Sequence, residues 1–190
     1  AFESGIPAPA SEVYLHEMPG GQFTNLKAQA RSLGLEDRWP EVAQAYADAN
    51  QMFGDIVKVT PSSKVVGDMA LMMVAQNLTR AQVEDPAHDV AFPDSVADML
   101  KGNLGQPHGG WPKAIQAKVL KGETALTTRP GAEVPAVDLE AVRAKLSSEL
   151  NGFRVDDEDL NGYLMYPKVF LDYMGRHKLY GPVRTLPTRT

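Results

Sequence analysis

The sequence contains no cysteine, which excludes disulfide bonds and thiolate chemistry and suits a reducing compartment. No run approaches 18 consecutive apolar residues, so we expect no membrane-spanning helix. Basic residues number 19 against 24 acidic ones, and the net charge of −5 argues against a nucleic-acid-binding protein. The first residues have neither a basic nor an apolar region, so we expect no signal peptide. The start without methionine and the abrupt end at 187–190 suggest a piece of a longer polypeptide.

Motifs of common self-contained active sites are missing as well. The four histidines have no shared spacing and no cysteine beside them, so we expect no metal site made by this chain alone. Residues 102–110 contain several glycines, but the glycine spacing and the preceding strand of a phosphate-binding loop are absent. No Gly-x-Ser-x-Gly motif is present. The acidic run 156–159 is better explained as the solvated start of a helix than as a cation site.

Most of the sequence shows helical periodicity. Its 190 residues, 43% of them hydrophobic, are enough for one domain, or for one domain with trailing segments. The apolar spacing and the flanking starter and stopper residues predict helices over 23–33, 37–54, 61–76, 79–84, 93–101, 111–121 and 138–150, with two more from 156 to 178 around Pro167. Residues 13–16 alternate weakly and predict a short strand, 56–59 form a β-branched run, and 18–21 predict a turn. The expected fold is therefore mainly α, with at most one or two short strands.

The longest stretch without periodicity divides the chain. Residues 122–137 contain two prolines and predict a linker. This linker would separate a helical region, 1–121, from a C-terminal helical segment, 138–190. Asp138 is expected to cap the first helix of that segment, because an aspartate just before an apolar-periodic run is a typical N-cap.

One helix start, in residues 60–68, carries an unusual combination of polar groups. Thr60 suits the N-cap and Pro61 the first helical position, while Ser62 and Ser63 crowd the first turn. Lys64 lies in that turn although a cation there opposes the helix dipole. Free backbone N–H groups, hydroxyls and an ammonium at one helix tip predict a small polar ligand site. From spacing alone, an ordinary capped helix with a solvated lysine remains the simpler interpretation.

Two long segments point to a known family. Residues 16–26 read HEMPGGQFTNL and residues 49–68 read ANQMFGDIVKVTPSSKVVGD. Together they resemble the biotin-dependent pyruvate carboxylases, in the region directly C-terminal to the metal-binding barrel of the carboxyltransferase domain. Weaker support comes from residues 105–112, 129–131 and 165–167. The oxaloacetate decarboxylase α subunit and a transcarboxylase subunit share the Pro-Gly-Gly turn and the Thr-Pro helix start, but the full Thr-Pro-Ser-Ser-Lys form resembles the pyruvate carboxylases.

The resemblance implies a fold and four site residues. The chain would form a helical, funnel-like extension that packs on a (β/α)8 barrel not present in this sequence. Thr60 matches the threonine that relays a proton between pyruvate and biotin, a task for which a hydroxyl is suited because it both donates and accepts. Ser63 and Lys64 match residues that contact the biotin ureido group, and Gln22 matches the amide that closes the same pocket. No residue matches a metal ligand or a pyruvate-binding arginine, because the family carries those on the barrel.

The resemblance also implies cofactors and partners outside the chain. Biotin would arrive on a carrier domain, and a divalent metal such as zinc or manganese would be bound by the missing barrel. The substrates would be pyruvate and oxaloacetate. The parent enzyme would be a homotetramer in the cytoplasm or, in a eukaryote, in the mitochondrial matrix. Residues 138–190 would lead toward the allosteric region of that enzyme. The isolated chain would be inactive. Two alternatives stay open: a decarboxylase or transcarboxylase subunit, and a purely structural module of the same assembly.

Overall fold

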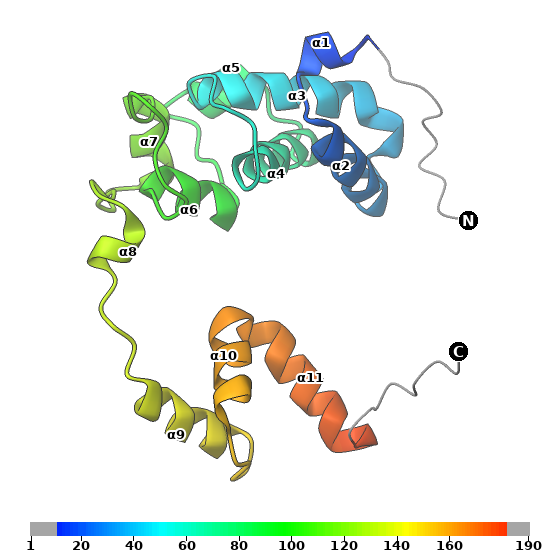
Figure 1. Cartoon of the computed structure of the whole chain (residues 1–190). Coiled ribbons are helices and arrows are strands. Elements are labelled where there is room, and N and C mark those ends of the chain that lie inside the picture. Colours follow the sequence, from blue (N-terminus) through cyan, green and yellow to red (C-terminus); the bar gives the residue numbers. More distant parts are fainter. Residues whose placement is uncertain (1–10, 182–190) are drawn as a thin grey trace. The chain divides into compact units, whose positions relative to one another are not determined.

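The computed structural model describes residues 11–181 and divides the chain into two compact units, 1–134 and 135–190. The predictions about the extreme start and the end at 187–190 lie outside the described residues. Every regular element described is helical (Figure 1). The first unit contains α1 (Val13–His16), α2 (Gly20–Ser32), the 3-10 turn η1 (Glu36–Arg38), α3 (Trp39–Met52), α4 (Ser62–Ala75), α5 (Arg80–Glu84), α6 (Asp94–Lys101), α7 (Lys113–Leu120) and α8 (Pro130–Glu133). The second contains α9 (Leu139–Glu149), α10 (Asp157–Met165) and α11 (Pro167–Tyr180).

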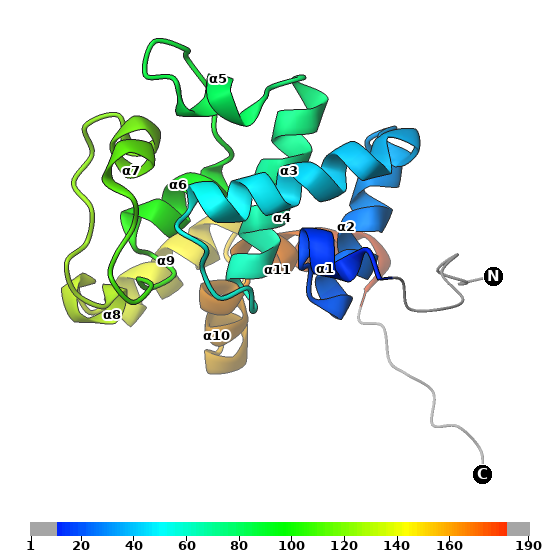
Figure 2. The same cartoon turned by 90° about the horizontal axis from the view of Figure 1, so that it is seen from above.

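Helix α4 is the centre of the first unit. It packs against α2, α3 and α6, and Figure 2 shows it passing between α2 and α6 beneath α3. Its apolar residues point in almost every direction, which is typical of a helix enclosed by others. Val66, Met69 and Ala70 are completely buried and Met73 nearly so. Met69 and Met73 thus lie in the core of this unit, and Met72, which is half-buried, packs against that core.

Three helix starts follow the predicted capping chemistry. The Thr79 hydroxyl accepts a hydrogen bond from the Gln82 amide and completes a capping box at α5. Asp138 accepts from the Ala141 amide and caps α9. The Asp156 carboxylate accepts a hydrogen bond from the Asp159 amide and caps α10, which confirms that the acidic run begins a helix.

The second unit is a small cluster of three helices. Its core consists of one apolar residue from α9, one from the loop before α10, one from α10 and two from α11: Leu146, Val155, Leu160, Phe170 and Met174. The Arg143 guanidinium joins α9 to the start of α10 by donating to the Val155 carbonyl at 2.7 Å and to Asp157 at 2.6 Å. The boundary between the two units, after Val134, lies inside the 122–137 stretch, which also contains the single helical turn α8.

Two sequence predictions near the N-terminus are wrong. Residues 13–16 form the short helix α1 instead of a strand, because the Leu15 and Glu17 amides find local partners in the Glu12 and Val13 carbonyls at 2.8 and 2.7 Å. No strand within residues 11–181 is present to pair with them. The expected turn at 18–21 is also shorter than predicted, because α2 already begins at Gly20.

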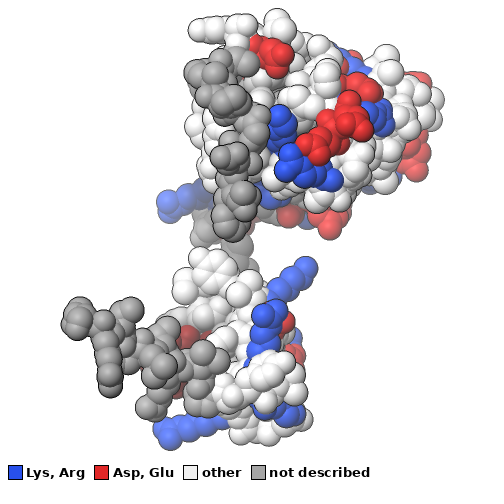
Figure 3. Space-filling model, turned by 90° about the vertical axis from the view of Figure 1, so that its right-hand side faces the viewer, with Lys and Arg blue, Asp and Glu red and all other residues white. Residues whose placement is uncertain are grey.

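The surface of the first unit carries mixed charge. On the face seen in Figure 3, acidic and basic side chains lie next to one another. Several charged side chains of this unit form ion pairs, as in the 2.6 Å contacts Arg31–Glu36 and Arg38–Glu41. Within residues 11–181 no helix is both long and apolar enough to cross a membrane.

Candidate functional site

Helix α4, which carries two of the four predicted site residues, begins at Ser62 with Pro61 in the N-cap position. The prediction that Thr60 caps this helix is wrong. The Ser63 amide, which a Thr60 hydroxyl would have capped, donates to the Val59 carbonyl at 2.9 Å. A backbone carbonyl of the preceding turn thus satisfies this amide, and the Thr60 side chain is left exposed and free for another task.

The rest of the first turn is also satisfied internally. The Ser62 hydroxyl accepts from the Val59 amide at 3.2 Å and is within donating distance of the Val57 and Val59 carbonyls at 2.8 and 2.7 Å. The Lys64 amide donates to the Pro61 carbonyl at 3.1 Å. The predicted cluster of free N–H groups and hydroxyls is therefore largely used by the turn itself. Within residues 11–181 the hydroxyls of Thr60 and Ser63 make no hydrogen bond, and the remaining polar side chain of this turn is that of Lys64.

The Lys64 side chain is 59% exposed, but its ammonium is not free. Its Nζ lies 2.7 Å from Oδ2 of Asp68, one turn further along α4. The same oxygen accepts a hydrogen bond from Oγ of Ser95 in α6, also at 2.7 Å. Asp68 therefore orients the Lys64 side chain, so this lysine is not simply solvated.

Gln22 of α2 packs against α4, the helix that carries Ser63. Both residues are buried, with 8% and 5% of their surface exposed. The two helices approach closely at Gly67, one turn after Ser63. A Cβ atom on Gly67 would lie 2.5 Å from Nε2 of Gln22 and 2.9 Å from Cδ1 of Leu26. The tertiary structure thus brings Gln22, distant in sequence, against the helix that carries Ser63 and Lys64.

We expect Gly67→Ala to disturb this interface selectively. The added methyl must displace the ends of Gln22 and Leu26, an overpacking cost of about 1–3 kcal/mol, offset by about 1 kcal/mol of helix propensity. The net loss of unfolding free energy should be no more than about 2 kcal/mol, measured by denaturant unfolding. The matched control is Gly175→Ala in α11, where nothing lies within 4 Å and the same change should stabilise the chain. Equal effects of the two substitutions would contradict the close contact.

An ion pair links the two long motifs. Nζ of Lys58 lies 2.9 Å from Oε2 of Glu17, and only 12% of the Lys58 side chain is exposed. The hydrogen bond from Lys58 lowers the pKa of the Glu17 carboxyl. The pair connects the segment before α2 with the segment before α4, and so holds the region of Gln22 close to that of Thr60. Sequence reasoning missed it, although both residues lie within the motifs that carry the resemblance.

His16 supports the segment that leads into α2. The ring is buried and stacks on Phe23 with 5.5 Å between centroids, and its Nδ1 accepts the Met18 amide hydrogen bond at 3.0 Å. Accepting at Nδ1 requires that nitrogen to be unprotonated. Burial lowers the pKa of His16, and the nearby Glu12 carboxylate opposes this only in part.

We expect this histidine to make stability depend on pH. Because the folded state favours the neutral ring, the contribution is complete above the ordinary pKa of 6.5 and is lost as the pH falls below it. Each unit by which folding lowers the pKa corresponds to about 1.4 kcal/mol. His16→Gln should flatten the slope of unfolding free energy against pH between about 7.5 and 5. An unchanged slope in His16→Gln would contradict this prediction.

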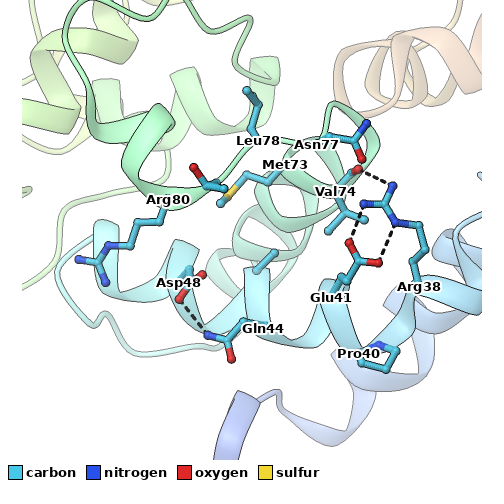
Figure 4. Close-up of a pocket in the computed structure, with 12 residues that line it drawn as sticks. Arg38, Pro40, Glu41, Gln44, Asp48, Met73, Val74, Asn77, Leu78 and Arg80 are labelled. Atoms are coloured by element: carbon cyan, nitrogen blue, oxygen red, sulfur yellow. Dashed lines mark hydrogen bonds and ion pairs between the residues drawn. The ribbon is translucent and has the colours of Figure 1, made fainter.

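A cavity with a volume of about 530 Å³ lies at the other end of α4 (Figure 4). Arg38 lines it, but its guanidinium is already committed: it donates twice to Glu41, at 3.0 and 2.6 Å, and once to the Val74 carbonyl at 3.0 Å. A 14-residue helix is about 21 Å long. The cavity is therefore remote from Lys64. A smaller cavity of about 270 Å³ lies beside the turn that precedes α4 and is lined by Pro61 and Ser62.

Comparison with known proteins defines the class of this helical region. The profile described as "Conserved carboxylase domain" matches residues 13–190, nearly the whole chain. The chain belongs to this conserved carboxylase domain family. The resemblance found in the motifs is thereby confirmed, and so is the mainly helical fold.

The similar proteins are pyruvate carboxylases. The chain is 50% identical over 189 residues to the enzyme of Bacillus subtilis and 46% identical over 179 residues to the mitochondrial enzyme of Homo sapiens. It spans only 16% and 15% of those proteins. Among solved structures, the carboxyl transferase domain of Rhizobium etli pyruvate carboxylase is 65% identical with a TM-score of 0.84, over 98% of this chain and 31% of that one. The same domain with pyruvate and biocytin gives a TM-score of 0.86 over 99% of this chain.

Proposed function

We propose that this chain is a helical part of the carboxyltransferase of a biotin-dependent pyruvate carboxylase. In this proposal it supplies side chains for carboxyl transfer to pyruvate, giving oxaloacetate. The supporting observation is the 65% identity to a carboxyl transferase domain whose structure has been solved with pyruvate and biocytin. Because the chain spans 31% of that domain, the remainder of the domain must supply the rest of the active site.

The structure offers groups that fit a biotin ureido ring. The Lys64 ammonium donates one hydrogen bond to Asp68 and retains two further donors. The Gln22 amide is buried beside Gly67 of α4 and makes no hydrogen bond within residues 11–181. We assign Lys64, Ser63 and Gln22 to holding the ureido group. Bound biotin, in its carboxylated form, supplies the carboxyl group.

Thr60 is assigned the proton transfer. Its hydroxyl is exposed and does not cap α4, so accepting and donating a proton at Oγ1 competes with no structural hydrogen bond of the described turn. The Lys58–Glu17 pair fixes the neighbouring backbone. A hydroxyl that relays a proton must lie between the two reactants and needs no shifted pKa. In this proposal the turn before α4 sets the position of the Thr60 hydroxyl.

The remaining components of the proposal lie outside this chain. They are the barrel with its divalent metal, the biotin carrier domain, a tetrameric parent enzyme and its location in the cytoplasm or mitochondrial matrix. Residues 1–121 would bear the biotin pocket, 122–137 would be the linker, and 138–190 would lead toward the allosteric region. Within residues 11–181 no three histidine, aspartate or glutamate side chains lie close enough together to hold a metal ion.

A paired assay tests the proposal. The full-length carboxylase carrying this chain should form oxaloacetate from pyruvate, bicarbonate and ATP, and avidin should abolish the activity. The 190-residue chain alone should show neither this activity nor pyruvate-dependent decarboxylation of oxaloacetate, because it lacks the barrel. Decarboxylation by the full-length protein without any ATP-dependent carboxylation would instead indicate a decarboxylase subunit. Activity of the isolated chain would contradict the proposal that the reaction requires the barrel.

A further inference from the structure

The carboxylate of Asp68 joins two helices at the ammonium of Lys64. Its Oδ2 receives the Lys64 Nζ at 2.7 Å from within α4 and the Ser95 Oγ at 2.7 Å from the first turn of α6. Asp68 is mostly covered, with 19% of its side chain exposed, whereas the Lys64 side chain is 59% exposed. The Asp68 carboxylate, which accepts the hydrogen bond, is thus mostly buried, whereas the Lys64 side chain, which donates it, is mostly exposed.

This arrangement differs from two other pairs four residues apart, in α9 and α5. In α9, Lys145 and Glu149 are 3.8 Å apart and 68% and 43% exposed. In α5, Arg80 and Glu84 are 3.2 Å apart, and both are more than a third exposed. Within residues 11–181, neither of these acceptor oxygens receives a hydrogen bond from another helix. Exposed pairs of this kind fix a side chain only weakly.

A lysine ammonium binds a ligand more tightly when its side chain is already held in one conformation. Its four-carbon stem has several rotatable bonds, and a free side chain loses this freedom when it is immobilised on a ligand. A partner that restricts the rotamers beforehand removes part of that loss. Because Ser95 belongs to α6 and α6 packs on α4, the position of the Asp68 carboxylate is set by helix packing rather than by its own rotamers.

We propose that Asp68 and Ser95 are positioning residues, which hold the Lys64 ammonium ready for the ureido oxygen of biotin. The inference rests on the proposed function of Lys64. Asp68 touches the lysine and Ser95 touches Asp68, and both act through Lys64. The Lys64 ammonium still has two N–H donors for the ligand while Asp68 occupies the third.

Direct binding of biocytin to the full-length carboxylase tests this inference. The enzyme is produced without biotin, so that its own carrier domain leaves the site open, and the Kd of added biocytin is measured by saturation-transfer NMR. Asp68→Ala should weaken biocytin binding about three- to tenfold, the range expected for immobilising one long side chain. Ser95→Ala should weaken it less, and Asp68→Asn should lie between wild type and Asp68→Ala. Glu84→Ala, which removes the acceptor of the exposed pair in α5, is the matched control and should not change the Kd.

A double-mutant cycle with Lys64→Met separates the possible outcomes. If Asp68 acts through Lys64, Asp68→Ala should have no further effect once Lys64 is methionine. An equal loss in both backgrounds would mean that Asp68 only supports the fold and would overturn the inference. Tighter binding in Asp68→Ala would overturn it as well, because the pair would then sequester the ammonium. If Lys64→Met itself leaves the Kd unchanged, the proposed role of Lys64 fails and the inference falls with it. If Lys64→Met weakens binding but Asp68→Ala does not, only the inference fails.

Discussion

Replacing Thr60 by alanine in the full-length carboxylase should reduce carboxylation of pyruvate by about 100-fold or more. Removal of the hydroxyl abolishes the proposed proton relay between the two reactants. The change should have little effect on stability, because the Val59 carbonyl, not the Thr60 hydroxyl, satisfies the Ser63 amide. ATP-dependent carboxylation of biotin should survive, since we place that reaction in another domain. The measurements are kcat for oxaloacetate formation and the unfolding midpoint of the same variant.

Thr79 provides the matched control for this prediction. It is a threonine at a helix start that does cap its helix, through a complete capping box with Gln82. Thr79→Ala should therefore cost about 1 kcal/mol of stability and leave carboxyl transfer unchanged. Thr60→Ser, which keeps the hydroxyl, should retain activity within about tenfold of wild type. A Thr60→Ala enzyme that stays within this limit would exclude the relay.

Lys64→Gln should have the second large effect, which is a loss of affinity for biotin without a loss of affinity for pyruvate. A hydrogen bond from a charged donor contributes up to about 3 kcal/mol, which corresponds to about 100-fold in affinity. Gln22→Ala removes a neutral donor and should cost less, about 0.5–1.5 kcal/mol for the hydrogen bond. In the carboxyltransferase half-reaction with free biotin, the KM for biotin should rise in both variants and more in Lys64→Gln. The KM for pyruvate should stay nearly constant, because we assign pyruvate binding to the barrel.

Packing needs its own control here, because Gln22 is buried against Gly67. Leu26 touches the same glycine and is completely buried. Leu26→Ala should destabilise the chain by about 2–5 kcal/mol. It should raise the KM for biotin only in proportion to its effect on pyruvate. Equal effects of Gln22→Ala on both KM values would show that the interface collapses, and would argue against a direct contact with biotin.

The sequence alone determined those features that depend on neighbours within a few residues. Thr79, Asp138 and Asp156 cap helices because each side chain reaches an amide three residues ahead, whatever the rest of the chain does. The apolar spacing of residues 65–74 likewise predicts a buried helix, and α4 is one. The motifs at 16–26 and 49–68 were enough to indicate the family.

Only the tertiary structure decided how the candidate site is supported. Thr60 and Thr79 both precede a helix, yet a carbonyl of the preceding turn displaced Thr60 from its predicted cap. The partners of Lys64 and Gln22 were also beyond sequence reasoning: Asp68 receives Ser95 from 27 residues away, and Gln22 meets Gly67 across two helices. Such contacts depend on how α2 and α6 pack on α4, and packing is set by the shape of whole helix surfaces rather than by local spacing. For this reason the sequence could nominate candidate residues for the site, whereas the contacts that orient those residues could not be predicted from it.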